Sequence, residues 1–155
     1  MAKRISAGLV MYHWRGGELE FFLAHPSGPF TKKKDEGHWT IPKGEPDGDE
    51  PLLDVAQREF KEETGLEPRG PFLELGCIQQ KGGKWVHAWA FEGDCTSPIR
   101  SNTYSMEWPP GSGTLREFPE VDRAEFFGLE EARRKIKETQ FPLLERLVTA
   151  LHNKV

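Results

Sequence analysis

The sequence predicts a layered protein of the α/β or α+β class, in which a mixed β-sheet is covered by helices on both faces. Short apolar segments of strand length come in pairs separated by glycine turns, and three longer segments have the length and caps of helices. Hairpins, crossovers and helices do not alternate regularly along the chain. This irregular order favours a mixed sheet over a regular βαβ arrangement.

The expected strands are apolar runs that end at glycine, proline or charged turn residues. The runs RISAGLVMYHW and LEFFLAH flank RGGE, and FLELGCIQQ and KWVHAWAFE flank KGG, so each pair is expected to form a hairpin. The run HWTIP is expected to be a short strand that its own proline ends. The expected strands are residues 4–14, 19–25, 38–42, 72–80, 84–92 and 124–127.

Three helices are expected, at residues 51–64, 129–138 and 142–152. Pro51 and Pro142 suit the first helical position, and Gly65 suits the end of the first helix. That helix has an apolar stripe for packing, formed by Leu53, Ala56 and Phe60. Two segments rich in proline and glycine are expected to be loops, at residues 26–37 and 93–117. The second is either a functional loop or an irregular insertion, with a short strand near residues 104–108.

Length, charge and cysteines limit the possible classes of protein. The chain has 155 residues, which fits one domain over residues 1–155, acting as a monomer or homodimer. A net charge of -4 argues against stable nucleic-acid or anionic-membrane binding, and no apolar run reaches membrane-spanning length. Cys77 and Cys95 form no metal-binding pattern, so we expect free thiols and a cytoplasmic location.

Three glutamates share one face of the helix expected at 51–64. Glu59, Glu62 and Glu63 stand at i, i+3 and i+4, a spacing at which like charges repel. Either water solvates such a face or a cation binds between the charges. Carboxylate oxygens are hard ligands that suit Mg²⁺ or Mn²⁺.

The segment GEPDGDEPLLDVAQREFKEETGL, residues 44–66, resembles the signature of the Nudix hydrolases. The matching positions are Gly44, Glu50, Arg58, Glu59, Phe60, Glu62, Glu63, Gly65 and Leu66. A match at this many spaced positions is far more specific than a lone glycine motif. The order of the flanking strands and helices also resembles that family over nearly the whole chain. The resemblance implies a Nudix-type α/β/α sandwich with a mixed central sheet.

The resemblance also implies roles for individual residues. Glu59, Glu62 and Glu63 are then metal ligands, and one of them can act as the general base. Arg58 is expected to fix a carboxylate by charge-assisted hydrogen bonds, the alternative being a surface ion pair with Glu62 or Asp54. The carbonyl of Lys43, just before Gly44, can join the metal shell, and Glu50 supports the junction of loop and helix.

A fourth carboxylate often joins such sites from a later loop. In FPEVDRAEFF, Glu120 is the best placed candidate and Glu125 the second. For each of them, a solvated surface glutamate is the alternative.

The family resemblance implies Mg²⁺-dependent hydrolysis of a pyrophosphate bond in a nucleotide. Hydrolases of diadenosine polyphosphates in this family often have the Pro-Lys-Gly found at residues 42–44, which favours dinucleoside polyphosphates or nucleoside triphosphates. Glu45 follows where those enzymes commonly have histidine. The alternatives are ADP-ribose or a nucleotide sugar as substrate, or a noncatalytic nucleotide-sensing module.

Candidate substrate-binding residues lie outside the signature. Lysines could contact phosphates, and tryptophans could stack on a base, although most of Trp39, Trp85, Trp89 and Trp108 are expected in or near the core. His87 could act as a base near neutral pH or be an ordinary hydrogen-bonded sheet histidine. The candidates are Lys43, Lys84, His87, Trp39 and Lys33, the last from the run Lys32–Lys34, which could also be a solvated loop.

Overall fold

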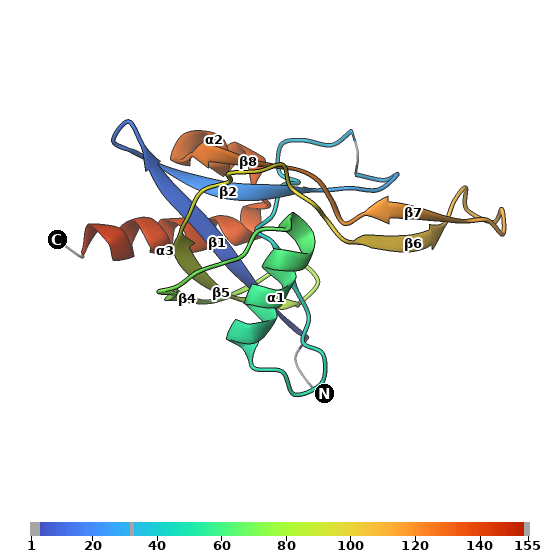
Figure 1. The fold of residues 1–155 in the computed structure, drawn as a ribbon, viewed down its shortest axis with the longest axis horizontal. Helices are drawn as coiled ribbons and strands as arrows, with labels where there is room; N and C mark the ends of the chain where they lie inside the picture. The colour runs from blue at the N-terminus through green and yellow to red at the C-terminus, as the bar shows by residue number, and fades with distance from the viewer. Residues whose placement is uncertain (1–3, 32, 154–155) are drawn as a thin grey trace.

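A mixed β-sheet forms the centre of the protein (Figure 1). The computed structural model describes residues 4–31 and 33–153. The strand order is β4-β5-β1-β2-β8, and β3 pairs with β1 beside this path. β1 runs parallel to β5 and antiparallel to β2, which confirms the predicted mixed sheet. The strands are β1 (Ile5–Arg15), β2 (Glu18–Pro26), β3 (Lys43–Gly44), β4 (Leu73–Gln79), β5 (Trp85–Glu92) and β8 (Val121–Gly128).

Helices cover both faces of this sheet, as predicted. The helices are α1 (Leu52–Thr64), α2 (Leu129–Lys135), the 3₁₀ helix η1 (Glu138–Gln140) and α3 (Phe141–His152). α1 packs on β1 and β5, whereas α2 packs on β2 and β8, and α3 packs on β4. None of the helices in the described parts of the chain is long and apolar enough to cross a membrane.

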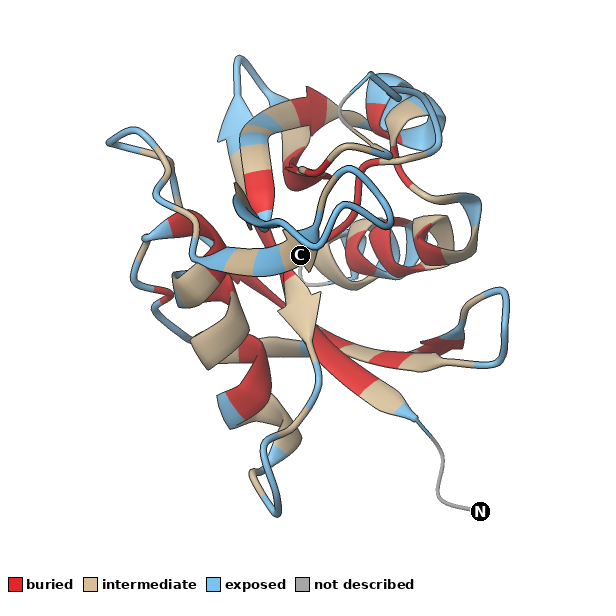
Figure 2. Cartoon of the chain, turned by 90° about the vertical axis from the view of Figure 1, so that its right-hand side faces the viewer, coloured by how far each residue is buried: buried red, intermediate tan, exposed pale blue. Residues whose placement is uncertain are grey.

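Strand alternation divides the buried side chains into two cores, one on each face of the sheet. In Figure 2, buried residues are coloured red on both strands and helices. On β1, Leu9 and Met11 face α1, and Val10 between them belongs to the core beneath α2 and α3. Side chains of one strand therefore reach two different surfaces, and the face of a side chain decides which site it can join.

Helix α1 begins one residue after its predicted start and ends at the predicted glycine. Pro51 takes an extended conformation (φ -60°, ψ 142°) and precedes the helix, so the helix starts one residue later than expected. Gly65 adopts a left-handed conformation (φ 77°) and donates its N–H to the carbonyl of Lys61. Ala56 and Phe60 are fully buried, so the predicted apolar stripe anchors the helix to the sheet.

The prediction of a regular strand at 38–42 was wrong. Thr40 and Trp39 make only isolated bridges, to Ala24 on one side and to Ile136 on the other. The backbone N–H of Ile41 donates to a side chain, the amide oxygen of Gln140. Because consecutive residues have different partners, no continuous ladder forms until the two-residue strand β3.

The segment 93–117 contains more structure than predicted. β6 (Thr103–Glu107) matches the one expected strand, but β7 (Leu115–Pro119) pairs with it to form a second, two-stranded sheet. This hairpin projects from the body of the protein (Figure 1). Its base is tied to the end of α1, since the N–H of Asn102 donates to the carbonyl of Glu62 (2.7 Å).

Three boundaries in the last third of the chain also differ from expectation. β8 begins at Val121 instead of near residue 124, and α2 ends at Lys135 instead of 138. Ile136 is extended (ψ 150°) and almost fully buried, which stops the helix. α3 starts at Phe141, so Pro142 is its second residue.

Candidate metal and phosphate site

The three signature glutamates lie on the last two turns of α1, against strand β3. Gly44 of β3 lies so close to Glu59 that a Cβ at position 44 would stand 2.0 Å from the Glu59 Cδ. Only glycine leaves room there for the carboxylate. The glycine therefore brings the backbone of β3 directly beside the glutamate face of the helix.

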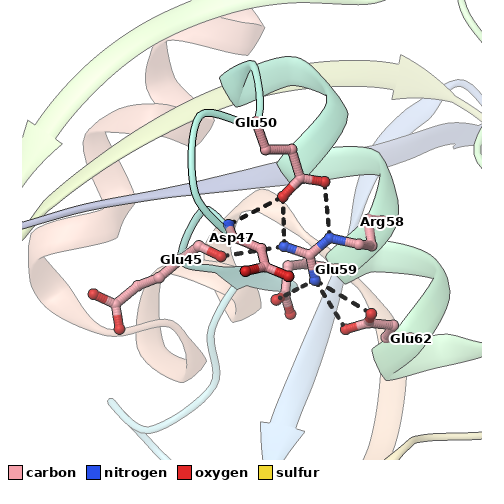
Figure 3. A network of polar contacts seen from close by, with 6 residues as sticks. All are labelled: Glu45, Asp47, Glu50, Arg58, Glu59 and Glu62. Carbon is pink, nitrogen blue, oxygen red and sulfur yellow. Dashed lines mark hydrogen bonds and ion pairs between the residues drawn. The ribbon is translucent and has the colours of Figure 1, made fainter.

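Arg58 ties this face to the preceding loop (Figure 3). Its Nε and one terminal nitrogen donate to the two oxygens of Glu50, at 2.9 and 2.8 Å. The other terminal nitrogen donates to Oε1 of Glu59 (3.1 Å) and of Glu62 (3.2 Å). The backbone N–H of Asp47 also donates to Glu50, and the pKa of Glu50 is lowered, chiefly by its hydrogen bonds with Arg58. A bidentate guanidinium pair thus fixes where two of the carboxylates can point.

The carboxylates are crowded and partly withdrawn from water. Glu63 is only 8% exposed, and burial, followed by the charge of Glu59, raises its pKa well above the ordinary value. Burial, followed by the charge of Glu62, also raises the pKa of Glu59. A hydrogen bond joins the carboxyl groups of Glu59 and Glu63. Ionising both groups at once is strongly unfavourable unless a cation lies between them.

The carboxylate oxygens of Glu59, Glu62 and Glu63 suit a hard divalent cation. In this structure the three side chains are not arranged around one. Within residues 4–31 and 33–153, no group of three histidine, cysteine or acidic side chains has metal-binding geometry. Glu62 is turned toward Arg58, while Glu59 and Glu63 contact each other. Mg²⁺ typically keeps several waters and needs only one or two carboxylates. Glu59, Glu62 and Glu63 therefore supply enough carboxylates for such a cation on one helix face.

Of the two candidates for a fourth carboxylate, Glu120 lies nearer the cluster. Its backbone N–H donates to the carbonyl of Asn102, which is itself tied to the end of α1. Burial, followed by the charge of Glu62, raises the pKa of Glu120. On β8, Phe126 faces the core beneath α1, and Phe127 faces the core beneath α2 and α3. Glu125 is two residues before Phe127, so it lies on the same face of the sheet as Phe127. Strand alternation therefore places Glu125 on the face opposite α1.

A cleft of about 990 Å³, lined mainly by basic residues and by Glu138 and Glu145, lies beside Lys43 of β3. Lys43, Lys84 and Lys137 line it together with basic residues at its rim, among them Lys81. Burial is the main cause that lowers the pKa of Lys43, and the charge of Lys137 lowers it further. The charge of Glu63 acts in the opposite direction. The cleft attracts anions beside a cluster that attracts cations.

A family model of the NUDIX domain matches residues 2–147. The chain belongs to the Nudix family. A protein from Caenorhabditis elegans, named bis(5'-nucleosyl)-tetraphosphatase (asymmetrical), is 41% identical over 61 residues. That match spans 39% of this chain and 40% of the length of the C. elegans protein.

Two solved structures share this Nudix fold. The binary complex of a C. elegans Ap4A hydrolase has a TM-score of 0.68 and 24% identity, covering 97% of this chain and 98% of that one. The Nudix domain of Shewanella oneidensis NrtR complexed with ADP ribose has a TM-score of 0.70 and 16% identity, covering 97% of this chain and 90% of that one. Similarity at this identity establishes the fold of the protein.

Trp39 was wrongly predicted to bind substrate in this Nudix protein. Its side chain is only 1% exposed and lies edge-on to His25 and Phe127. Its Nε1 donates to Asp35 (2.8 Å). A ring enclosed by core side chains cannot stack on a base, so Trp39 is a core residue.

The structure brings together only two of the remaining predicted substrate residues, Lys43 and Lys84. His87 contacts Glu74 (Nε2 to Oε2, 2.7 Å) and stacks on Trp89, which is the arrangement of a hydrogen-bonded sheet histidine. Lys33 is exposed in the 26–37 loop, and Lys32 lies outside the described residues. Lys43 and Lys84 do come together, in the lysine-lined cleft.

Lys137 was not among the predicted substrate-binding residues. The basic run ARRKIK, residues 132–137, is visible in the sequence, but it fell within the helix expected at 129–138. Because α2 ends at Lys135 and Ile136 turns into the core, Lys137 faces the cleft.

Proposed function

We propose that this Nudix protein hydrolyses a pyrophosphate linkage in a nucleoside diphosphate joined to another group, with Mg²⁺ as cofactor and Mn²⁺ as a possible substitute. The observation that supports this most directly is the crowded glutamate face of α1, which Gly44 approaches closely and Arg58 orients. A phosphate chain needs cations at its oxygens while water attacks phosphorus, and both kinds of group are present.

The residues of the chain have distinct parts in this proposal. Glu59, Glu62 and Glu63 hold the metal, together with the backbone carbonyl of Lys43, and Glu120 is the candidate fourth carboxylate. The metal, when bound, neutralises phosphate oxygens and lowers the pKa of its water. One of the three α1 glutamates accepts the proton of the attacking water. Arg58 orients Glu59 and Glu62 through the hydrogen bonds seen here.

Dinucleoside polyphosphates and nucleoside triphosphates are the foremost substrates in this proposal. The Pro-Lys-Gly of residues 42–44 and the partial match to the C. elegans tetraphosphatase support them. ADP-ribose and nucleotide sugars are the second candidate, because a structure with the same fold is a complex with ADP ribose. A noncatalytic nucleotide-sensing module is the alternative outside enzymes.

A substrate panel tests the proposal. Dinucleoside polyphosphates, nucleoside triphosphates and ADP-ribose are incubated with Mg²⁺ in ¹⁸O-water, and the products are separated and weighed. We expect metal-dependent turnover that Glu62→Gln lowers at least ~100-fold. Glu125→Gln removes the same charge on the other face of the sheet and is the matched control. Near-wild-type turnover in Glu62→Gln would contradict the assignment, and binding without any turnover would favour the sensing module.

The two cysteines support a proposed compartment. Cys77 and Cys95 are both free thiols, as expected from the sequence. Free thiols persist in a reducing environment. We therefore propose the cytoplasm as the location.

A further inference from the structure

A thiol, an imidazole and a carboxylate meet on strands β4 and β5, away from the metal site. The Sγ of Cys77 lies 3.3 Å from Nδ1 of His87, and Nε2 of the same ring lies 2.7 Å from Oε2 of Glu74. A nucleophile beside a base that a third group orients is the arrangement of an activated nucleophile. None of these three side chains has a part in the proposed hydrolysis.

A β-bulge on β4 brings the three groups to one face of the sheet. Cys77 is directly opposite His87 in the antiparallel pair, so both side chains point to the same face. Glu74 is three residues before Cys77 and would point to the opposite face of a regular strand. The register shifts between Glu74 and Gly76, and Gly76 has a left-handed conformation (φ 81°), so Glu74 also faces His87. Bulges that re-aim a side chain in this way are frequent beside active sites.

The neighbours of His87 determine which of its ring nitrogens can accept a proton. The carboxylate of Glu74 only accepts hydrogen bonds, so Nε2 of the neutral ring carries the hydrogen and donates it. Nδ1 then has a free lone pair, which faces the thiol of Cys77 and can take its proton. The resulting imidazolium is held by Glu74 and stacks on Trp89, with ring centroids 4.3 Å apart. Both contacts favour the charged ring.

Cys95 lacks this arrangement and provides an internal comparison. Its Sγ donates to the carbonyl of Ser97 (3.2 Å). A carbonyl oxygen cannot take the proton of a thiol, so this contact stabilises the protonated form. Cys77 and Cys95 are both free and both partly exposed. The two thiols therefore differ in the base beside them, which only Cys77 has.

We propose that Cys77 is a modification site, at which His87 generates a thiolate that peroxides oxidise to a sulfenic acid. The thiolate sulfur attacks one oxygen of hydrogen peroxide, so an S–O bond forms and the O–O bond breaks. Sulfur loses two electrons to the departing hydroxide, which takes the proton of the His87 imidazolium and leaves as water. The step needs no metal and no nucleotide, so it is independent of the proposed hydrolysis.

Trapping of the sulfenic acid in the full chain tests this proposal. The protein is treated with hydrogen peroxide and dimedone, and peptide mass spectrometry measures the labelling rates of Cys77 and Cys95 separately. At about pH 6 an ordinary thiol is almost fully protonated, whereas a thiolate paired with an imidazolium reacts about tenfold faster despite its lower nucleophilicity. We expect an advantage of about tenfold for Cys77 over Cys95, and we expect His87→Gln to remove it.

Two further variants separate activation of the thiol from a loss of structure. Glu74→Gln changes a side chain that is 61% exposed and removes the charge that holds the imidazolium, so it should slow the labelling of Cys77. His152→Gln removes an exposed histidine at the end of α3 and should leave both labelling rates unchanged. Thermal unfolding checks each variant, and an unchanged rate at Cys95 shows that the fold has not opened.

Equal labelling of the two cysteines in the wild type would overturn the proposal. A Cys77 rate that neither His87→Gln nor Glu74→Gln lowers would overturn it as well, and so would an equal loss in His152→Gln. If His87→Gln does not fold, the result for Glu74→Gln decides the question alone.

Discussion

The close approach of Gly44 to Glu59 determines where one of the proposed metal ligands can lie. In Gly44→Ala the new Cβ would stand 2.0 Å from the Glu59 Cδ and 2.3 and 2.4 Å from its two oxygens, whereas ordinary contact begins at 3.4 Å. The carboxylate would have to move by about 1.4 Å, and a misplacement of about 1 Å in a catalytic group can cost ~100-fold in rate. The atoms that must move are the free end of a flexible side chain, so the fold should tolerate the change. We expect kcat to fall ~100-fold with little loss of stability.

Turnover of the best nucleotide of the panel, measured across a Mg²⁺ titration, checks this prediction together with thermal unfolding. Gly128→Ala is the matched control, because its φ is -65° and no atom of the described residues lies within 4 Å of the place that the added methyl group would take. It should behave as the wild type. Wild-type turnover in Gly44→Ala would refute the placement of Glu59 in the catalytic site. A large drop in melting temperature would show that the backbone of β3 gave way instead of the carboxylate.

Other substitutions and conditions separate the roles of the remaining acidic groups and of the arginine. Glu120→Gln should lower kcat at least ~10-fold and Glu125→Gln should not, so equal turnover in the two variants would exclude a special role for Glu120. Arg58→Lys should lower Mg²⁺ affinity or turnover about 10- to 100-fold. Lysine keeps the positive charge but cannot form the bidentate pair with Glu50. An unchanged Mg²⁺ titration would contradict this prediction. In EDTA, the free energy of unfolding should fall as pH rises above about 4.3, since the raised pKa of Glu63 means that the folded protein holds a proton that the unfolded chain releases. Urea unfolding at several pH values measures this slope, and Glu63→Gln or saturating Mg²⁺ should reduce it.

Features of the site that depend on local periodicity could be predicted from the sequence. The spacing of Glu59, Glu62 and Glu63 fixes their common face once the helix is recognised, and the helix follows from its apolar stripe and from Gly65. Arg58 precedes them on the same helix, so its reach to two glutamates is also a local property. The hairpins and the mixed sheet were predictable for the same reason, because each depends on short apolar runs and their turns.

Features that depend on distant partners could not be predicted in this way. Trp39 is a candidate in the sequence because a tryptophan ring can stack on a base, and only the packing of His25 and Phe127 shows that it is buried. Lys137 is separated from Lys43 by most of the chain, and a buried Ile136 decides which way it faces. Strand β7 has mostly exposed side chains and no apolar alternation, so its only signal is its partner β6.

The irregular segment that leads into β3 positions both the backbone beside the α1 glutamates and Lys43 of the cleft. Within six residues the chain passes from Trp39 in the core to Ile41, which Gln140 holds, and then to Lys43 and Gly44 on opposite sides of one short strand. A regular strand would satisfy the N–H of Ile41 through a neighbouring strand and would not need the amide. Because that amide also fixes the turn that carries Lys84, the position of the lysines is set by the same contact that positions the backbone beside the glutamates. The contacts of Gln140 therefore link the backbone that approaches the α1 glutamates to the turn that carries Lys84.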